Sequence, residues 1–147
     1  MQFEINNKVI RLCAKGMEME ATGAYEEAKI MFLKAWKEAG NDFERFTAAH
    51  YVARYQDSVE EKLKWDEKAL SYALKIKDKG VAINYPSLYL SIGKCFEELQ
   101  DFRKANENYR VALSYVENLP NNPYGTMIES GIRKGIERVS EKLAQRL

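Results

Sequence analysis

The side chains that could take part in catalysis are few and widely separated in this sequence. His50 is the only histidine, and its neighbours one helical turn away are Phe46, Thr47, Ala53 and Arg54. A catalytic imidazole needs a carboxylate to orient it and a nucleophile within hydrogen-bond reach. Thr47 is the only nucleophile at hand and no carboxylate stands at these positions, so we expect His50 to be a packed structural residue.

The two cysteines give no stronger sign of a reaction centre. Cys13 and Cys95 lack the CxxC spacing of a zinc or redox site, and we expect both to be reduced and buried. Lys94 precedes Cys95 and could lower the pKa of its thiol, but the sequence places no second ionisable group beside it. The chain also lacks a recognisable phosphate-binding loop, metal-ligand cluster or nucleophile motif. We therefore predict no cofactor, no metal and no enzymatic activity.

Charge and hydropathy indicate which kinds of partner this protein does not bind. The 147 residues include 23 basic and 22 acidic side chains, so no strong net field would draw the protein to nucleic acid or to an anionic membrane. No stretch approaches the roughly 18 consecutive apolar residues of a membrane span, and the N-terminus lacks the apolar core of a signal peptide. We expect a cytoplasmic protein that binds neither nucleic acid nor a membrane.

An internal repeat defines the elements that must position these side chains. Four residues recur 77 positions later, namely Gly16, Ala28, Phe32 and Ala35 as Gly93, Ala105, Tyr109 and Ala112. Ala69 divides that distance into intervals of 34 and 43 positions, so the second interval carries about nine extra residues, which we place around 77–85. Apolar residues within each unit follow three- and four-residue steps, which predicts an all-α chain.

Glycine, asparagine, aspartate and proline mark the ends of about seven helices, predicted at 3–22, 25–39, 42–56, 58–78, 83–99, 102–118 and 124–146. Short connections make successive helices antiparallel. The candidate N-caps are Asp42, Ser58, Asp101 and Asn122. The last helix has one apolar face and one charged face, which is typical of a helix that caps the open end of a repeat array.

These residues resemble tetratricopeptide repeats, whose 34-residue unit is a helix hairpin with a small residue in the first helix and Ala, aromatic, Ala in the second. Units are expected over about residues 9–42, 43–78 and 86–119, with the capping helix over about 124–146, in one domain spanning 1–147. The second unit departs from the pattern, with His50 where Gly or Ala is expected and Lys62 and Asp66 in place of Ala and an aromatic ring. The resemblance implies an α-solenoid of antiparallel hairpins coiled into a right-handed superhelix.

The resemblance also implies that the first helices of successive units line a concave groove that holds a peptide segment or helix of a partner protein. Carried over residue by residue, the partner-binding groove residues are Met17, Glu20, Thr47, Tyr51, Arg54, Tyr55, Ser91, Lys94 and Glu98. Methionine and tyrosine would supply an adaptable apolar centre, and the charged residues would pair with partner charges. Alternatively, Met17, Tyr51 and Tyr55 complete the packing between helices.

One branch of the family binds the terminal carboxylates of heat-shock chaperones through Lys, Asn and Arg at five groove positions. Those positions hold Cys13, Met17, Ala48, Ser87 and Ser91 in this chain, and none of these can pair with a carboxylate as a charged group. We therefore do not expect a chaperone-tail clamp.

The leading hypothesis is a non-catalytic adaptor that binds a protein or peptide in this groove. One alternative is a homo-oligomeric scaffold, with a homodimer contact at Trp65 on the irregular second unit. Another is a small-ligand sensor or an unrecognised enzyme that uses the groove near His50 and Cys95.

Overall fold

The computed structural model describes residues 6–146, and within that range every regular element is a helix, which confirms the predicted all-α class. The α-helices are α1 (Lys8–Ala21), α2 (Tyr25–Glu38), α3 (Asp42–Ala53), α4 (Val59–Ala73), α5 (Tyr85–Glu98), α6 (Phe102–Ser114) and α7 (Pro123–Gln145). Two short 3₁₀ helices are η1 (Lys79–Asn84) and η2 (Val116–Asn118). The chain forms two compact units, Met1–Asp78 and Lys79–Leu147, called unit 1 and unit 2 below.

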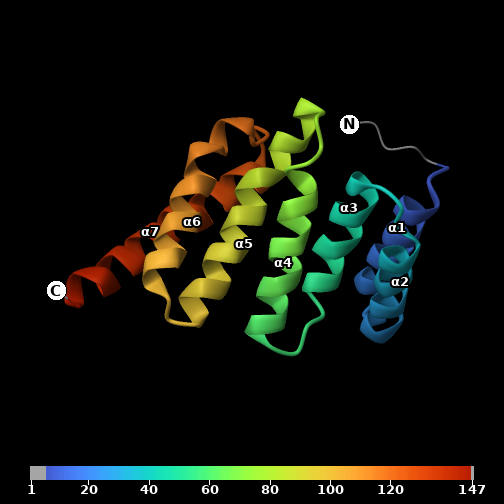
Figure 1. Cartoon of the computed structure of the whole chain (residues 1–147), viewed down its shortest axis with the longest axis horizontal. Helices are drawn as coiled ribbons and strands as arrows, with labels where there is room; N and C mark the ends of the chain where they lie inside the picture. The colour runs from blue at the N-terminus through green and yellow to red at the C-terminus, as the bar shows by residue number, and fades with distance from the viewer. Residues whose placement is uncertain (1–5, 147) are drawn as a thin grey trace. The chain divides into compact units, whose positions relative to one another are not determined.

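Unit 1 consists of the hairpins α1–α2 and α3–α4, whose members run antiparallel (Figure 1). Three of its helices begin at capped positions, where a side-chain oxygen accepts a backbone N–H that the helix leaves unpaired. Asn7 accepts from Ile10, Asn41 from Glu44 and Ser58 from Glu61. Our assignment of Asp42 as a cap is wrong, because the extended backbone at Asn41 brings the amide oxygen to the free N–H.

Unit 2 consists of η1, the hairpin α5–α6, η2 and the long helix α7, which packs against both helices of the hairpin. The predicted caps Asp101 and Asn122 are confirmed and accept from the backbone N–H groups of Lys104 and Gly125. The predicted excess around 77–85 is largely η1, and the boundary between the two compact units falls in the same segment.

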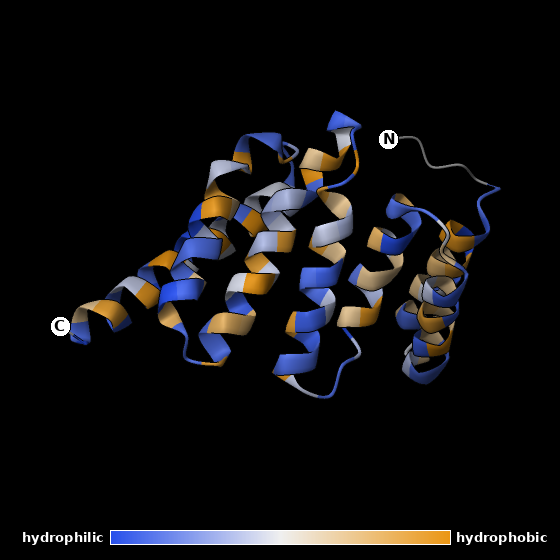
Figure 2. Cartoon of the chain, in the orientation of Figure 1, coloured by the Kyte–Doolittle hydropathy of each residue, from blue (hydrophilic) through white to orange (hydrophobic). Residues whose placement is uncertain are grey.

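Each unit has its own apolar core. Figure 2 shows apolar and polar bands alternating along the helices, as expected for amphipathic segments. The buried core of unit 1 includes Val9, Cys13, Ala28, Phe32, Ala35, Ala48 and Val52. That of unit 2 contains Leu90, Phe102, Ala105, Tyr109, Ala112, Ile128, Ile132 and Val139. The apolar face predicted for the capping helix therefore packs on α5 and α6.

The repeated glycines allow a ring of the second helix to press against the backbone of the first. A Cβ atom added at Gly16 would overlap the ring of Phe32, and one added at Gly93 would lie 2.7 Å from Tyr109 Cδ1. Gly135 of α7 closes the other side, since its added Cβ would lie 2.7 Å from Tyr109 Cζ. The ring of Tyr109 therefore lies between two glycines, and any side chain at either would displace it.

Several of the predicted helices extend beyond the ends of the helices in the structure. The first helix begins at Lys8, and the predicted residues 3–5 lie outside the described range. The third, fourth and sixth helices stop at Ala53, Ala73 and Ser114 rather than at 56, 78 and 118. In each case the chain continues in turns or in a 3₁₀ helix, which keeps local hydrogen bonds without the 3.6-residue period.

Candidate functional site

In unit 1 the predicted groove residues of α1 and α3 contact one another. The Tyr51 hydroxyl donates to Met17 Sδ over 3.0 Å, and the Tyr55 hydroxyl donates to Glu20 Oε2 over 2.6 Å. The Arg54 guanidinium donates to both carboxylate oxygens of Glu20. These contacts join residues 34 and 35 positions apart, so they fasten the first helix of one hairpin to the first helix of the next.

This cluster packs on the ring of Phe32. Tyr51 stacks on it with centroids 4.8 Å apart and an interplanar angle of 7°, and the guanidinium of Arg54 lies 5.0 Å from the centroid of Tyr51. Tyr51 and Tyr55 are half-buried, whereas Met17 keeps 48% of its surface exposed. The two tyrosines thus complete the packing between helices, as the alternative interpretation held, while Met17 and the edge of Arg54 face solvent.

Thr47 does not join this cluster. Its hydroxyl donates to the backbone carbonyl of Phe43 over 2.8 Å, one turn earlier in α3. That bond satisfies the hydroxyl within its own helix.

Unit 2 contains a related arrangement around Glu97, in which the tyrosine lies on α6 and the arginine on α7. The Tyr109 hydroxyl donates to Glu97 Oε1 over 2.6 Å, and Arg138 of α7 donates through Nε to Oε2 at 2.8 Å and through Nη2 to Oε1 at 3.0 Å. The hydrogen bonds from Arg138 hold the pKa of Glu97 below its ordinary value although partial burial opposes them. The carboxylate is therefore ionised at neutral pH and is shared between a guanidinium and a phenol.

Glu20 and Glu97 are separated by the same offset that relates Gly16 to Gly93 and Phe32 to Tyr109. The pairing of this glutamate with an arginine is therefore repeated in the two units, whereas the tyrosine comes from a different position in each, Tyr55 after α3 and Tyr109 on α6. The arginine was not predicted as the partner in either unit, because it lies 34 positions from the glutamate in unit 1 and 41 in unit 2. The recurrence of glutamate at the offset of the repeat was the available signal.

The remaining groove residues lie on α5. Lys94 and Glu98 are exposed and Ser91 is half-buried. Lys94, Glu97, Glu98 and Arg138 line a shallow depression of about 320 Å³. This surface carries two positive and two negative side chains, so it suits hydrogen-bonding groups of either sign and has no strong field of its own.

His50 lies in the irregular second hairpin, where it replaces the small residue found in the other two. Burial lowers the pKa of His50, the charges of Arg54 and Lys62 lower it further, and Asp66 opposes them. Asp66 is only 3% exposed and accepts from Lys62 Nζ at 2.9 Å. Where the imidazole stands in place of glycine, the facing aromatic ring is replaced by the smaller carboxylate of Asp66, so the two departures compensate each other in volume.

The cysteines and the tryptophan named in the sequence analysis take part in packing within their units. Cys13 and Cys95 are buried and form no disulfide, and burial raises the pKa of the Cys13 thiol to about 12. Cys95 lies in unit 2 and His50 in unit 1. Trp65 is half-buried, with its ring edge-on to Trp36 at 5.0 Å and Lys68 Nζ 4.2 Å from its centroid. Much of the Trp65 surface proposed for a homodimer contact is thus used within unit 1.

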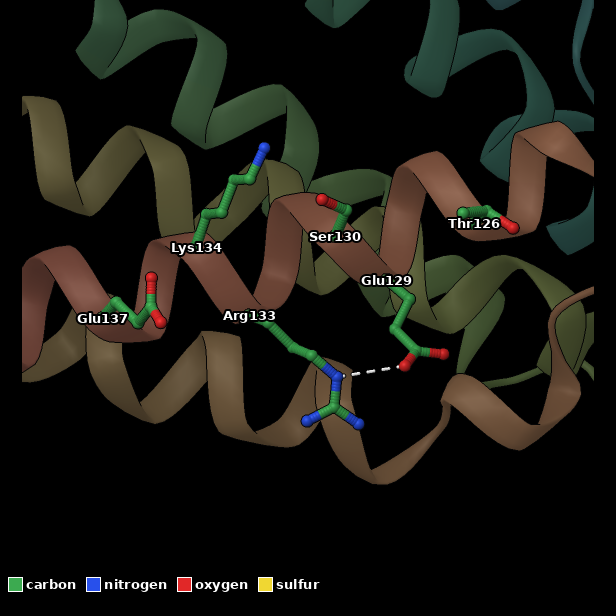
Figure 3. Close-up of a pocket in the computed structure, with 6 residues that line it drawn as sticks. All are labelled: Thr126, Glu129, Ser130, Arg133, Lys134 and Glu137. Carbon is green, nitrogen blue, oxygen red and sulfur yellow. Dashed lines mark hydrogen bonds and ion pairs between the residues drawn. The ribbon is translucent and has the colours of Figure 1, made fainter.

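A second polar depression runs along α7. It has a volume of about 500 Å³ and is lined by Thr126, Glu129, Ser130, Arg133, Lys134 and Glu137. Figure 3 shows these six side chains along one stretch of the helix, with Arg133 Nε donating to Glu129 Oε2 at 3.0 Å. We did not predict this depression from the sequence, since we interpreted the charged face of the last helix as that of a capping helix.

The described part of the chain provides neither a metal-binding cluster nor a membrane-spanning helix. Residues 6–146 contain no group of three or more His, Cys, Asp or Glu side chains arranged to hold a metal ion. No helix among them is both long enough and apolar enough to cross a bilayer.

A scan of the chain against protein-family models returned no match, and the comparisons with curated proteins and with solved structures returned none either.

Proposed function

We propose that this protein is a cytoplasmic, non-catalytic adaptor of the tetratricopeptide type, and that it binds a protein or peptide segment along the first helices of its hairpins. The observation that supports this proposal is the repeated pairing of a glutamate with an arginine in the clusters around Glu20 and Glu97. Each pairing ties the first helix of a hairpin to the helix that follows that hairpin, α1 to the C-terminal end of α3 and α5 to α7, so the side chains beside it are held at fixed positions before any partner arrives. Preorganisation of this kind lowers the entropic cost of binding.

The contact residues we assign to the partner differ from the structural ones. Tyr51, Tyr55 and Glu20 hold the helices together, while Met17, Lys94 and Glu98 have exposed side chains beside the clusters. An exposed methionine next to an arginine and a tyrosine provides an adaptable apolar contact with a polar rim. We propose that Met17 anchors an apolar side chain of the partner on unit 1, and that Lys94 and Glu98 make polar contacts with the partner on unit 2.

The test begins with co-purification of the native protein and identification of bound proteins by mass spectrometry. Affinity for the identified partner is then measured by calorimetry for wild type, Met17→Glu and Lys94→Glu. The control is Ile30→Glu, because Ile30 is 59% exposed, is also apolar and lies on the second helix of the first hairpin. We expect Met17→Glu to weaken binding by tenfold or more and Ile30→Glu to leave it unchanged.

Each variant must first show wild-type circular dichroism and thermal midpoint, so that a loss of affinity is not a loss of fold. A partner that binds Met17→Glu and Lys94→Glu as tightly as wild type would reject this site. Equal losses in Met17→Glu and Ile30→Glu would also reject it, because the effect would then not belong to the first helices.

A further inference from the structure

The helix α7 is fastened to the preceding hairpin α5–α6 in the same way as α3 is fastened to the preceding hairpin α1–α2. Arg54, the C-cap residue of α3, pairs with Glu20, and Arg138 of α7 pairs with Glu97. Arg54 and Arg138 therefore occupy equivalent positions. Aligning them relates each residue of α3 to one residue of α7.

The ring contacts support the same alignment. Tyr51 of α3 stacks on Phe32, and Gly135 of α7, the counterpart of Tyr51 in this alignment, lies against Tyr109. We conclude that α7 occupies the place of the first helix of a further hairpin. Residues 6–146 include no second helix for that hairpin, since α7 is the last element of the described chain.

The pattern of buried residues identifies the side of α3 that faces α4, the second helix of the same hairpin. Ala48 and Val52 belong to the core shared with α1 and α2. Its other buried residues, on a different side, are Phe46, Ala49 and Ala53. His50 lies among them in the helical order, and the charges of Lys62 and Asp66 on α4 act on it. This side of α3 is the one covered by α4.

On α7 the equivalent positions are occupied by polar residues. In the alignment of the two helices, the counterparts of Phe46, Ala49, His50 and Ala53 are Ser130, Arg133, Lys134 and Glu137. All four counterparts line the depression of about 500 Å³ shown in Figure 3. The depression therefore lies on the face of α7 that a second helix would cover, and three of the four residues are exposed where the equivalent residues of α3 are mostly buried.

A neighbouring depression extends this surface onto α6. It measures about 280 Å³ and is lined by Arg110, Leu113, Arg133, Ile136 and Glu137. The offset that relates Phe32 to Tyr109 also relates Trp36 to Leu113, and Trp36 is the residue on which Trp65 of α4 packs. A helix lying on α7 would thus find an apolar contact on α6 at the place where α4 finds one on α2.

The charges on this face specify the helix that fits it. The charges of Asp66 and Lys62 both act on His50, whose counterpart on α7 is Lys134, so a helix placed on α7 as α4 lies on α3 would bring the equivalent of Asp66 toward Lys134. Because that helix would run antiparallel to α7, we infer that the equivalent of Lys62, one turn earlier, would lie closer to Glu137 than to Lys134, which makes the net interaction attractive. Lys134 and Glu137 themselves make no ion pair within residues 6–146. A helix of the α6 type would instead present Ala105 and Tyr109 and leave these charges uncompensated.

We propose that this face of α7 is a docking site for one helix of a partner protein, which lies antiparallel to α7 and carries a basic residue four positions before an acidic one. The surface is separate from the first-helix site around Met17, so either proposal can fail without the other. In the resulting complex the partner helix would cover this face of α7 as α4 covers the equivalent face of α3, which is a helix-in-groove mode of recognition.

The probe is a fluorescein-labelled peptide of residues 58–74, which contains α4 with its cap Ser58. Its control is a peptide of residues 101–115, which contains α6 with its cap Asp101. Anisotropy titrations with the full chain should show roughly tenfold tighter binding of the first peptide, since two ion pairs distinguish them. Equal affinities would overturn the proposal.

Charge reversal tests the specific pairs. The double variant Lys134→Asp with Glu137→Lys should weaken binding of the 58–74 peptide by roughly tenfold, and a peptide carrying Lys62→Asp with Asp66→Lys should recover most of the loss. Recovery identifies the two pairs, because a merely disrupted surface would not improve with the reversed peptide. Loss without recovery, or no loss at all, would overturn the assignment.

A peptide of this length is only marginally helical in water and pays a folding cost on binding. The same helix is therefore also tethered after Leu147 through about 12 Gly/Ser residues, which raises its effective concentration to the millimolar range. The urea midpoint should rise with the tethered helix, fall back on charge reversal in α7 and recover with the reversed helix. If the urea midpoint is the same in all of these proteins, the proposal is overturned. Light scattering that shows a dimer dissociated by the α7 variant would also overturn it, because the occupant would then be a second copy of this chain.

Discussion

Two glycines of α7, one helical turn apart, predict opposite responses to the same substitution. At Gly135 an added Cβ would lie 2.7 Å from Tyr109 Cζ and 2.8 Å from Cε2, closer than packed atoms approach. At Gly131 the nearest atom would be Leu90 Cδ2 at 3.5 Å, an ordinary contact. Both positions are interior to one helix, so the backbone effect of replacing glycine by alanine is shared.

The magnitudes follow from that difference. Alanine in a helix interior is about 1 kcal/mol more favourable than glycine, so Gly131→Ala should stabilise unit 2 by roughly 0.5–1 kcal/mol. Gly135→Ala gains the same amount but forces the fully buried ring of Tyr109 to move, and overpacking of this kind costs about 1–3 kcal/mol. Tyr109 has little room to yield, because Gly93 lies against its other side. Gly135→Ala should therefore be about 1–3 kcal/mol less stable than Gly131→Ala.

Urea unfolding followed by circular dichroism measures both variants, and equal m-values would show that the same transition is compared. Tyr109→Leu removes the ring and provides the coupling control. In that background the two alanine variants should differ by much less than in wild type. If Gly135→Ala proves as stable as Gly131→Ala in the wild-type background, the ring is not held between the glycines and the reasoning is refuted.

Four shorter predictions concern other sites. The pKa of His50 is lowered in the folded state, so its contribution to stability is complete above about pH 6.5 and is lost as the pH falls toward the folded pKa. The urea midpoint of wild type should therefore decline from about pH 7.5 to about pH 5.5 more steeply than that of His50→Gln. Asp66→Phe should destabilise unit 1 by about 1–3 kcal/mol, because the ring meets the imidazole, and His50→Gly in the same chain should restore most of the loss in thermal melts. Gln100 has a φ of 64°, so Gln100→Gly should stabilise the α5–α6 turn by about 1 kcal/mol in urea titrations, and an unchanged midpoint would contradict this. The pKa of Cys13 is about 12, so its thiol should react slowly with a disulfide reagent at mildly alkaline pH and rapidly once urea unfolds the chain; fast reaction in the native state would show that the thiol is accessible.

Much of the fold could be predicted because its signals are local. The helical period of apolar residues gave the seven helices, and the turn residues placed most boundaries within a few positions. The ends that failed lie where the chain leaves the α-helix gradually, as at Ala73 and Ser114. Turns and 3₁₀ segments retain similar residues, so composition alone does not separate them from a last helical turn.

The candidate site was predictable only in part. Most groove residues lie on the expected helices, although Arg54 and Tyr55 lie just beyond the end of α3. Whether each faces a partner or a neighbouring helix depends on contacts between residues 34 or more positions apart. Tyr51 and Tyr55 illustrate this, because their spacing fits both roles and only the positions of Phe32 and Glu20 decide between them.

The sequence by itself determined the helices, their antiparallel pairing and the repeated glycine and ring positions, because each depends on hydrogen bonds and spacing within one or two turns of chain. The tertiary structure alone decided that Glu97 is shared between Tyr109 and Arg138, and that the polar face of α7 corresponds to the covered face of α3. Such relations join atoms brought together by packing across whole helices, and no short-range pattern encodes which side chains will meet there.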